Sequence, residues 1–123
     1  MKVKEIAFVA YPAEDPDKLF KFYRDVIGLK PAKVYPEEGP VQFVEFQVGP
    51  DSWFSIMPTS FAQRPAGTGV GVAFEVEDIE AALKEVKGHA RSAEDANDSP
   101  VCKYAAVEDP EGNRIMFHEM KPA

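Results

Sequence analysis

Three ionisable side chains in this sequence could carry out proton transfer. Glu45, Glu75 and His118 all lie in segments whose alternating pattern is typical of β-strands. Two carboxylates a few ångströms apart can serve as general acid and base, and histidine changes its charge near neutral pH. The simpler interpretation is that both glutamates are surface residues and that His118 is a histidine near solvent at a strand end. We favour this simpler interpretation for His118, because a general base needs a positioned partner and the sequence does not show one.

Other reactive groups offer less. Cys102 is followed by Lys103, but neighbours on a strand point to opposite faces, so we interpret Cys102 as a buried, inert thiol rather than a nucleophile. His89 lies in a polar loop, where we expect it to be solvated. The chain has no glycine-rich phosphate loop, no Ser-His-Asp pattern and no paired-cysteine motif. NTP hydrolysis, triad hydrolysis and structural zinc are therefore unsupported.

The elements that must position these groups occur as an internal repeat. Residues 6–11 and 71–76 predict strands, and each strand is followed by an acidic turn and a helical apolar pattern that stops at a glycine. The two helices are predicted near residues 15–27 and 78–86. Asp15 and Asp78 stand at equivalent positions, where each carboxylate can accept hydrogen bonds from the first helical turn. This spacing favours a duplication.

A hairpin follows each predicted helix. The first pairs residues 41–48 with residues 53–57, and the second pairs residues 101–107 with residues 114–120 around the turn-forming run Asp109-Pro-Glu-Gly-Asn113. Short extra strands fit near residues 33–35 and 90–92. We therefore predict module one at residues 1–57, a linker at 58–69 with two prolines and two glycines, and module two at 70–123, within one domain.

Three segments resemble a known family. Phe22-Tyr-Arg-Asp-Val-Ile-Gly-Leu29, Val72-Ala-Phe-Glu-Val-Glu-Asp78 and Asp109-Pro-Glu-Gly-Asn113 followed by Arg-Ile-Met-Phe are similar to segments of the vicinal oxygen chelate superfamily, which comprises glyoxalases, bleomycin-resistance proteins and extradiol dioxygenases. The resemblance covers nearly the whole chain. It implies an α+β fold of two βαβββ modules that form a curved mixed sheet with the helices outside, around a concave pocket, within a homodimer.

The resemblance also implies four metal-ligand positions, two on first strands and two on closing strands. Here they fall on Phe8, Gly71, Ser55 and Met116, where His, Gln or Glu would be expected. Phenylalanine and glycine have no donor atom, a thioether suits soft ions, and a neutral hydroxyl is a weak ligand. We therefore expect a metal-free member with no cofactor.

Period-two alternation predicts which residues face the concave pocket. Val44, Phe46 and Val48 form the face expected to pack under a helix. The opposite face and its counterpart in module two give these candidate ligand-binding residues: Phe8, Phe43, Glu45, Trp53, Ser55, Gly71, Glu75, Tyr104, Met116 and His118. Aromatic and thioether surface with a few charges suits a small organic ligand with an apolar body and a polar or cationic end. Alternatively, Phe8, Trp53 and Met116 simply fill the concave side as core.

Composition narrows the partners and the setting. The net charge is −7, which disfavours nucleic acid and anionic lipid surfaces as partners. A single cysteine cannot form an intramolecular disulfide, which fits a reducing compartment. The first ten residues lack a signal-peptide pattern, and no run approaches the roughly 20 apolar residues of a membrane span. We expect a cytoplasmic protein.

Two classes of function remain after this reasoning. The first is a metal-free binding protein that sequesters a small apolar or cationic molecule. The second is a lyase, isomerase or dioxygenase that uses either a non-standard metal set or acid-base residues among Glu45, Glu75 and His118. The missing metal ligands favour the first class, and the charged pocket residues keep the second open.

Overall fold

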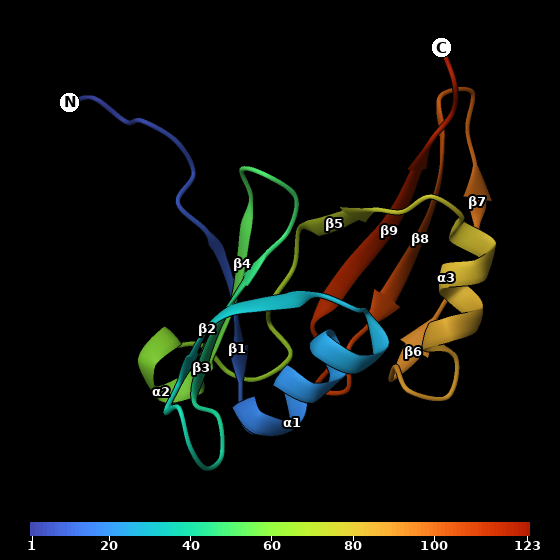
Figure 1. Ribbon diagram of the computed structural model, residues 1–123. Helices are drawn as coiled ribbons and strands as arrows, with labels where there is room; N and C mark the ends of the chain where they lie inside the picture. Colours follow the sequence, from blue (N-terminus) through green and yellow to red (C-terminus); the bar gives the residue numbers. More distant parts are fainter.

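The computed structural model describes residues 1–123 and contains two βαβββ modules (Figure 1). The first module consists of β1 (Val9–Ala13), α1 (Pro16–Lys21), the π-helix η1 (Phe22–Val26), β2 (Lys30–Tyr35), β3 (Phe43–Gln47) and β4 (Trp53–Pro58). The second consists of β5 (Val72–Glu75), α3 (Ile79–Val86), β6 (Ser92–Ala93), β7 (Asn97–Asp98), β8 (Cys102–Glu108) and β9 (Arg114–Met120). Both β6 and β7 pair with β8 on the edge away from β9, so together they take the place of one strand of the βαβββ pattern. A short helix, α2 (Thr59–Ala62), lies between them. The predicted α+β fold is confirmed.

Each module has its own mixed sheet. The strand order is β1-β4-β3-β2 in the first and β5-β9-β8-β6 in the second, with β7 also paired to β8. In both sheets the first strand runs parallel to the closing strand, and the remaining pairs are antiparallel. β1 and β5 therefore stand at the edges of their sheets, and each has one strand neighbour.

Both helices begin and end where the sequence pattern predicts. Asp15 and Asp78 each accept a 3.2 Å hydrogen bond from the backbone N–H three residues later. Gly28 and Gly88 follow the helices with φ near +85°, a conformation that residues with a Cβ rarely adopt. One difference is that the first helix widens into π geometry, with Ile27 N–H bonded to Phe22 C=O five residues back. That widening places both Phe22 and Tyr23 in the core.

The first strand begins later than predicted. It covers Val9–Ala13 instead of residues 6–11, so Pro12 belongs to the strand and not to the turn, while Phe8 precedes it. Residues 1–8 extend away from the body of the protein (Figure 1). The pairing of β1 with β4, its only strand partner, begins with Val9 and Phe54, although β4 itself starts one residue earlier at Trp53. The apolar residues that precede Val9 in the sequence, 6–8, form no strand pair.

The linker also differs from its prediction, because it is not wholly irregular. Its first residue, Pro58, still belongs to β4, and α2 follows directly. Gln63 then ends that helix in the left-handed conformation, with φ +54°. A helix at this point places Phe61 beside the first sheet, where it contacts Phe43.

A shared core joins the two modules on the helix side of both sheets. Val44 and Phe46 of β3 are buried there as predicted, and so are alternate residues of β8 and β9. The rings of Phe54 in β4 and Phe74 in β5 meet edge to face at 5.7 Å, which links the cores of the two modules. The opposite face of each sheet is left largely open. No helix in the chain has the length and apolar character needed to span a membrane.

Candidate functional site

The open face of the first sheet carries a hollow of about 260 Å³. Its lining is mostly apolar and comes only from residues 8–61, which are Phe8, Lys33, Val34, Tyr35, Phe43, Val44, Glu45, Ser55, Ile56, Met57 and Phe61. Four predicted site residues therefore come together here: Phe8, Phe43, Glu45 and Ser55. Glu45 and Ser55 are direct partners across β3 and β4. The hollow thus combines aromatic walls with a few polar groups, as small-molecule sites commonly do.

Aromatic rings gather at this hollow without being buried. Phe43 packs edge to face on Phe61, with centroids 5.1 Å apart, and lies 6.3 Å from Tyr35. Tyr35 and Phe61 are about two-thirds exposed, and Phe8 is half exposed. The alternative that Phe8, Trp53 and Met116 fill the concave side as core is wrong, because none of the three is buried. Tyr35 and Phe61 were missed in the sequence, since one lies on an edge strand and the other in the supposed linker.

A second hollow, of about 520 Å³, runs along the free edge of β5. Trp53 and Gly49 lie on the side of the first module, and Gly71, Ala73 and Glu75 lie on the other. Three more predicted residues, Trp53, Gly71 and Glu75, are therefore brought together across the two modules. Glu45 is not among them, since it lines the first hollow, so the two glutamates do not form the carboxylate pair considered from the sequence.

The remaining predicted residues lie on the open face of the second sheet in two rows. Register pairs Glu75 with His118 and His118 with Tyr104, so these three side chains stand on neighbouring strands. The adjacent row consists of Ala73, Met116 and Ala106. A polar row therefore lies beside a shallow apolar row, which has small residues on both sides of the thioether.

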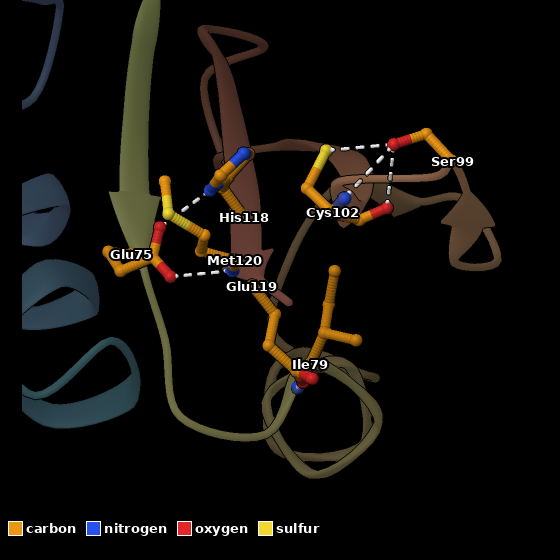
Figure 2. A network of polar contacts seen from close by, with 7 residues as sticks. All are labelled: Glu75, Ile79, Ser99, Cys102, His118, Glu119 and Met120. Carbon is orange, nitrogen blue, oxygen red and sulfur yellow. Dashed lines mark hydrogen bonds and ion pairs between the residues drawn. The ribbon is translucent and has the colours of Figure 1, made fainter. Parts of the chain in front are cut away.

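Within the polar row, Glu75 and His118 form a close pair (Figure 2). Glu75 Oε1 lies 2.5 Å from His118 Nδ1, and Glu75 Oε2 accepts a 2.7 Å hydrogen bond from Met120 N–H. The backbone N–H of Met120, and then His118, lower the pKa of the Glu75 carboxyl, so it stays ionised at neutral pH. His118 is partly exposed near the end of β9, as the simpler interpretation expects, but it also has the positioned carboxylate partner that the sequence did not show.

Glu119 does not join this pair. It points to the other face of β9, where its Oε1 accepts a 2.9 Å hydrogen bond from the backbone N–H of Ile79 at the start of α3 (Figure 2). A carboxylate in that position accepts from a backbone N–H that has no partner within the helix, and it interacts favourably with the positive end of the helix dipole. Its role is therefore to anchor α3 on the sheet.

The two remaining reactive groups differ in exposure. Cys102 is half-buried, not fully buried as expected. Its side chain lies on the open face of the sheet, on the same side of β8 as Tyr104. Its Sγ lies 3.3 Å from Ser99 Oγ, and Ser99 also bonds the backbone of Cys102 (Figure 2). His89 is exposed in the loop after α3, as expected.

The residues present do not fit a resident metal ion. Ser55 faces Ala10 across the β1–β4 pair, and Met116 faces Ala73 across the β5–β9 pair. These alanines, like Phe8 and Gly71 two positions earlier, have no donor atom. Nowhere in the chain do three or more His, Cys, Asp or Glu side chains come together as a metal-binding group. A divalent ion normally needs three or four such donors around one point.

The turn of Asp109–Asn113 holds the two modules together instead of contributing to a site. Both Asp109 and Asn113 are fully buried, although they are polar. Asn113 Oδ1 accepts from Gly69 N–H at 2.8 Å, and its Nδ2 donates to Asp109 Oδ2 at 2.9 Å and to Pro12 C=O at 3.3 Å. The turn therefore ties β9 to the first strand and to the segment that precedes β5.

Comparisons with known proteins agree with this geometry. A model of the family described as "Glyoxalase/Bleomycin resistance protein/Dioxygenase superfamily" matches residues 5–117. The chain is similar to TnmS3, an antibiotic binding protein from Streptomyces sp. CB03234, with a TM-score of 0.79, 17% identity, and 98% and 99% of the two chains covered. No curated protein matches the sequence.

Two further solved structures are similar in fold. A lactoylglutathione lyase from Agrobacterium tumefaciens has a TM-score of 0.74 at 21% identity, with 96% of this chain and 95% of the other covered. A superfamily member from Sphaerobacter thermophilus has a TM-score of 0.79 at 18% identity, with 95% and 98% covered. At these identities the likeness shows the fold, and it is shared by a binding protein and by an enzyme.

Proposed function

The chain belongs to the glyoxalase/bleomycin resistance protein/dioxygenase superfamily, and from this premise we propose that it is a binding protein for a small organic molecule and uses no metal ion. The hollow on the first sheet is the observation that carries this proposal. Eight of its eleven lining residues are hydrophobic, and they include exposed aromatic rings. Exposed aromatic surface that remains clustered on a folded protein marks a place where something else binds.

The donor set supports binding rather than metal chemistry. The family's enzymes imply a metal centre, but the equivalent positions here offer one hydroxyl, one thioether and two residues without donors. A pocket of this composition would desolvate a divalent ion without replacing its ligands. The structural similarity to an antibiotic binding protein is consistent with sequestration of a compound in place of its conversion.

The proposed ligand has a largely apolar, aromatic body. The sequence suggested a ligand with a polar or cationic end, but of the two candidate glutamates Glu75 already hydrogen-bonds to His118 and to Met120 N–H. Only Glu45 remains as a carboxylate facing the first hollow, and Lys33 lies directly opposite it on β2. A single carboxylate opposite a lysine gives little preference for a cationic ligand, so the aromatic walls of the hollow are the stronger determinant of binding.

A thermal-shift screen of small aromatic compounds tests the proposal. We expect at least one compound to raise the melting temperature of the wild-type protein in a concentration-dependent way, since a ligand at 100 times its Kd stabilises by about 2.7 kcal/mol. The same compound should lose this effect when Phe43 is changed to Ala. A screen in which no compound of this class stabilises the protein would contradict the proposed function.

A second candidate function rests on the Glu75–His118 pair. A histidine oriented by an ionised carboxylate is the usual arrangement of a general base, so a metal-free lyase or isomerase of the same superfamily remains an alternative. Turnover of a bound compound, lost in H118Q but not in H89Q, would favour the enzyme over the binding protein. Stable, unmodified compound after prolonged incubation would favour binding.

We also propose that the protein acts as a homodimer in the cytoplasm. The first hollow, at about 260 Å³, is smaller than the roughly 300–1,000 Å³ of ordinary ligand pockets. It is lined by the first module alone, so a second chain laid over it would enclose a bound molecule. The exposed side chains of Val3, Ile6 and Phe8 on the N-terminal arm give such a chain apolar surface to cover. The single cysteine fits a reducing compartment.

A further inference from the structure

The second sheet presents an apolar shelf beside a polar row. The shelf consists of Ala73, Met116 and Ala106, which are direct neighbours on β5, β9 and β8. Because both neighbours of Met116 are alanines, a flat ring can lie against the thioether without meeting a large side chain. The shelf borders the hollow of about 520 Å³ along β5, and Trp53 lies on the far side of that hollow.

The polar row fixes the orientation of one imidazole. One carboxylate oxygen of Glu75 accepts from Met120 N–H, and the other contacts His118 Nδ1. An ionised carboxylate accepts hydrogen bonds only, so Nδ1 must carry a proton. His118 Nε2 is the other ring nitrogen. It is turned away from Glu75 (Figure 2), and no group of the chain hydrogen-bonds to it.

We infer that this face binds a planar aromatic molecule through an acidic hydroxyl, a phenol or an enol, which donates its hydrogen bond to His118 Nε2. This surface lies on the second sheet and not in the first hollow, so the inference goes beyond the proposed function and adds a second binding face for a ligand of defined class. The ring lies on the shelf of Ala73, Met116 and Ala106, and its hydroxyl reaches the polar row. Tyr104, the neighbour of His118 on β8, stands on the other side of the imidazole and can bond the same oxygen.

Proton transfer between the ligand hydroxyl and His118 needs no other reactant. The hydroxyl proton of the ligand moves to Nε2, which leaves a phenolate or enolate and an imidazolium, while Nδ1 keeps its proton toward Glu75. The imidazolium is stabilised by Glu75, and the oxyanion is stabilised by the imidazolium. The ionisable groups that face His118 from the neighbouring strands are Glu75 on β5 and Tyr104 on β8, and the Cys102 thiol lies one pair further along β8.

Two coumarins provide a direct test on the whole 123-residue chain. 7-Hydroxycoumarin has the required ring and hydroxyl, and 7-methoxycoumarin has the same ring without the proton. Trp53 is the only tryptophan of the chain and lines the adjoining hollow, so quenching of its emission reports binding. The excitation spectrum of bound 7-hydroxycoumarin separates the phenol from the phenolate.

We expect the hydroxyl compound to bind at least about tenfold more tightly than the methoxy compound, since a hydrogen bond to a charged group has about that effect. Bound 7-hydroxycoumarin should also show more phenolate than the free compound at the same pH. H118Q should remove both the preference and the phenolate signal. E75Q should reduce the phenolate signal while leaving the affinity for 7-methoxycoumarin unchanged, because Glu75 acts through His118.

Two control variants separate the polar row from the shelf. H89Q changes the other histidine, which is exposed in a loop, and should behave as wild type. A73L fills the shelf from the edge strand and should weaken both coumarins by the same factor. Melting curves of each variant, compared with wild type, exclude loss of folding as the cause.

The results that would overturn the inference are distinct from those that would overturn the proposed function. Equal affinity of the two coumarins in wild type, or a preference unchanged in H118Q, would overturn the hydroxyl-binding role of His118. Absence of binding by both coumarins, alongside a screening compound whose stabilisation requires Phe43, would also overturn the inference but leave the proposed function intact. The proposed function itself fails only when no aromatic compound binds.

Discussion

The phenolic hydroxyl of Tyr23 donates a 2.8 Å hydrogen bond to Asp109 Oδ2, across 86 positions of sequence and between the two modules. Tyr23 comes from the π-helical end of the first helix, and Asp109 opens the turn between β8 and β9. Both side chains are fully buried. Two of the three segments that resemble the superfamily therefore meet each other, and what they provide is the attachment of one module to the other.

Changing Tyr23 to Phe should destabilise the protein by about 1–3 kcal/mol, because Asp109 would remain buried with one hydrogen bond fewer. Urea unfolding followed by circular dichroism measures the change. Y35F is the matched control, since the side chain of Tyr35 is largely exposed. It should shift the free energy of unfolding by less than about 0.5 kcal/mol. Equal stability of Y23F and Y35F would show that the link between the modules contributes nothing.

The Asp109 carboxyl should titrate above the usual 3.8, because its burial raises the pKa. Below pH 3.8 both folded and unfolded states are protonated. As pH rises, the unfolded chain loses this proton first, so the contribution of Asp109 to stability falls until the folded pKa is passed. Carboxyl carbon NMR shifts give the midpoint directly. The Tyr23 hydroxyl lowers this pKa, so Y23F should move the midpoint higher still. A midpoint at or below 3.8 would contradict a raised pKa for the buried Asp109 carboxyl.

Truncation of two phenylalanines on β3 should affect different properties, ligand binding in one case and stability in the other. Phe43 faces the first hollow, so F43A should weaken binding of a screened compound more than about tenfold with little change in melting temperature. Phe46 is fully buried on the other face, so F46A should lower stability by about 3–5 kcal/mol. Isothermal titration and thermal melting measure the two effects. Binding unaffected by F43A would move the ligand away from this hollow.

Purified protein, prepared without chelator or affinity tag, should contain substoichiometric metal. Added zinc, nickel, manganese or iron should not raise its melting temperature, because Phe8, Ser55, Gly71 and Met116 offer at most one weak oxygen donor. Elemental analysis by mass spectrometry measures the content. One metal ion per chain that disappears in H118A would restore a metal-dependent enzyme as the better account.

Light scattering at micromolar concentration should give a mass twice the 13.6 kDa of one chain. Deleting residues 1–7 should weaken the dimer, because that arm carries exposed Val3 and Ile6. A scattering mass of a single chain at the same concentration would count against the dimer. Retention of ligand binding by such a monomer would show that one chain completes the site.

The sequence by itself determined the order and kind of the elements. The Asp15 and Asp78 caps, the glycines after both helices and the turn at Asp109–Asn113 are local signals, and local backbone chemistry decides them whatever the rest of the chain does. Strand alternation likewise separated the buried Val44 and Phe46 from the open Phe43 and Glu45. These features gave the two βαβββ modules and the general location of a pocket.

Only the tertiary structure decided which of those pocket residues act together. Strand register is set by pairing between distant segments, and register joined Glu75 to His118. Glu45 is separated from both because its strand belongs to the other sheet. The same pairing started β1 at Val9 and left Phe8 in front of it. Turn signals in the sequence predict which strands form a hairpin, but not which distant strand pairs with the other edge, so the Glu75 partner of His118 is fixed only when the sheet forms.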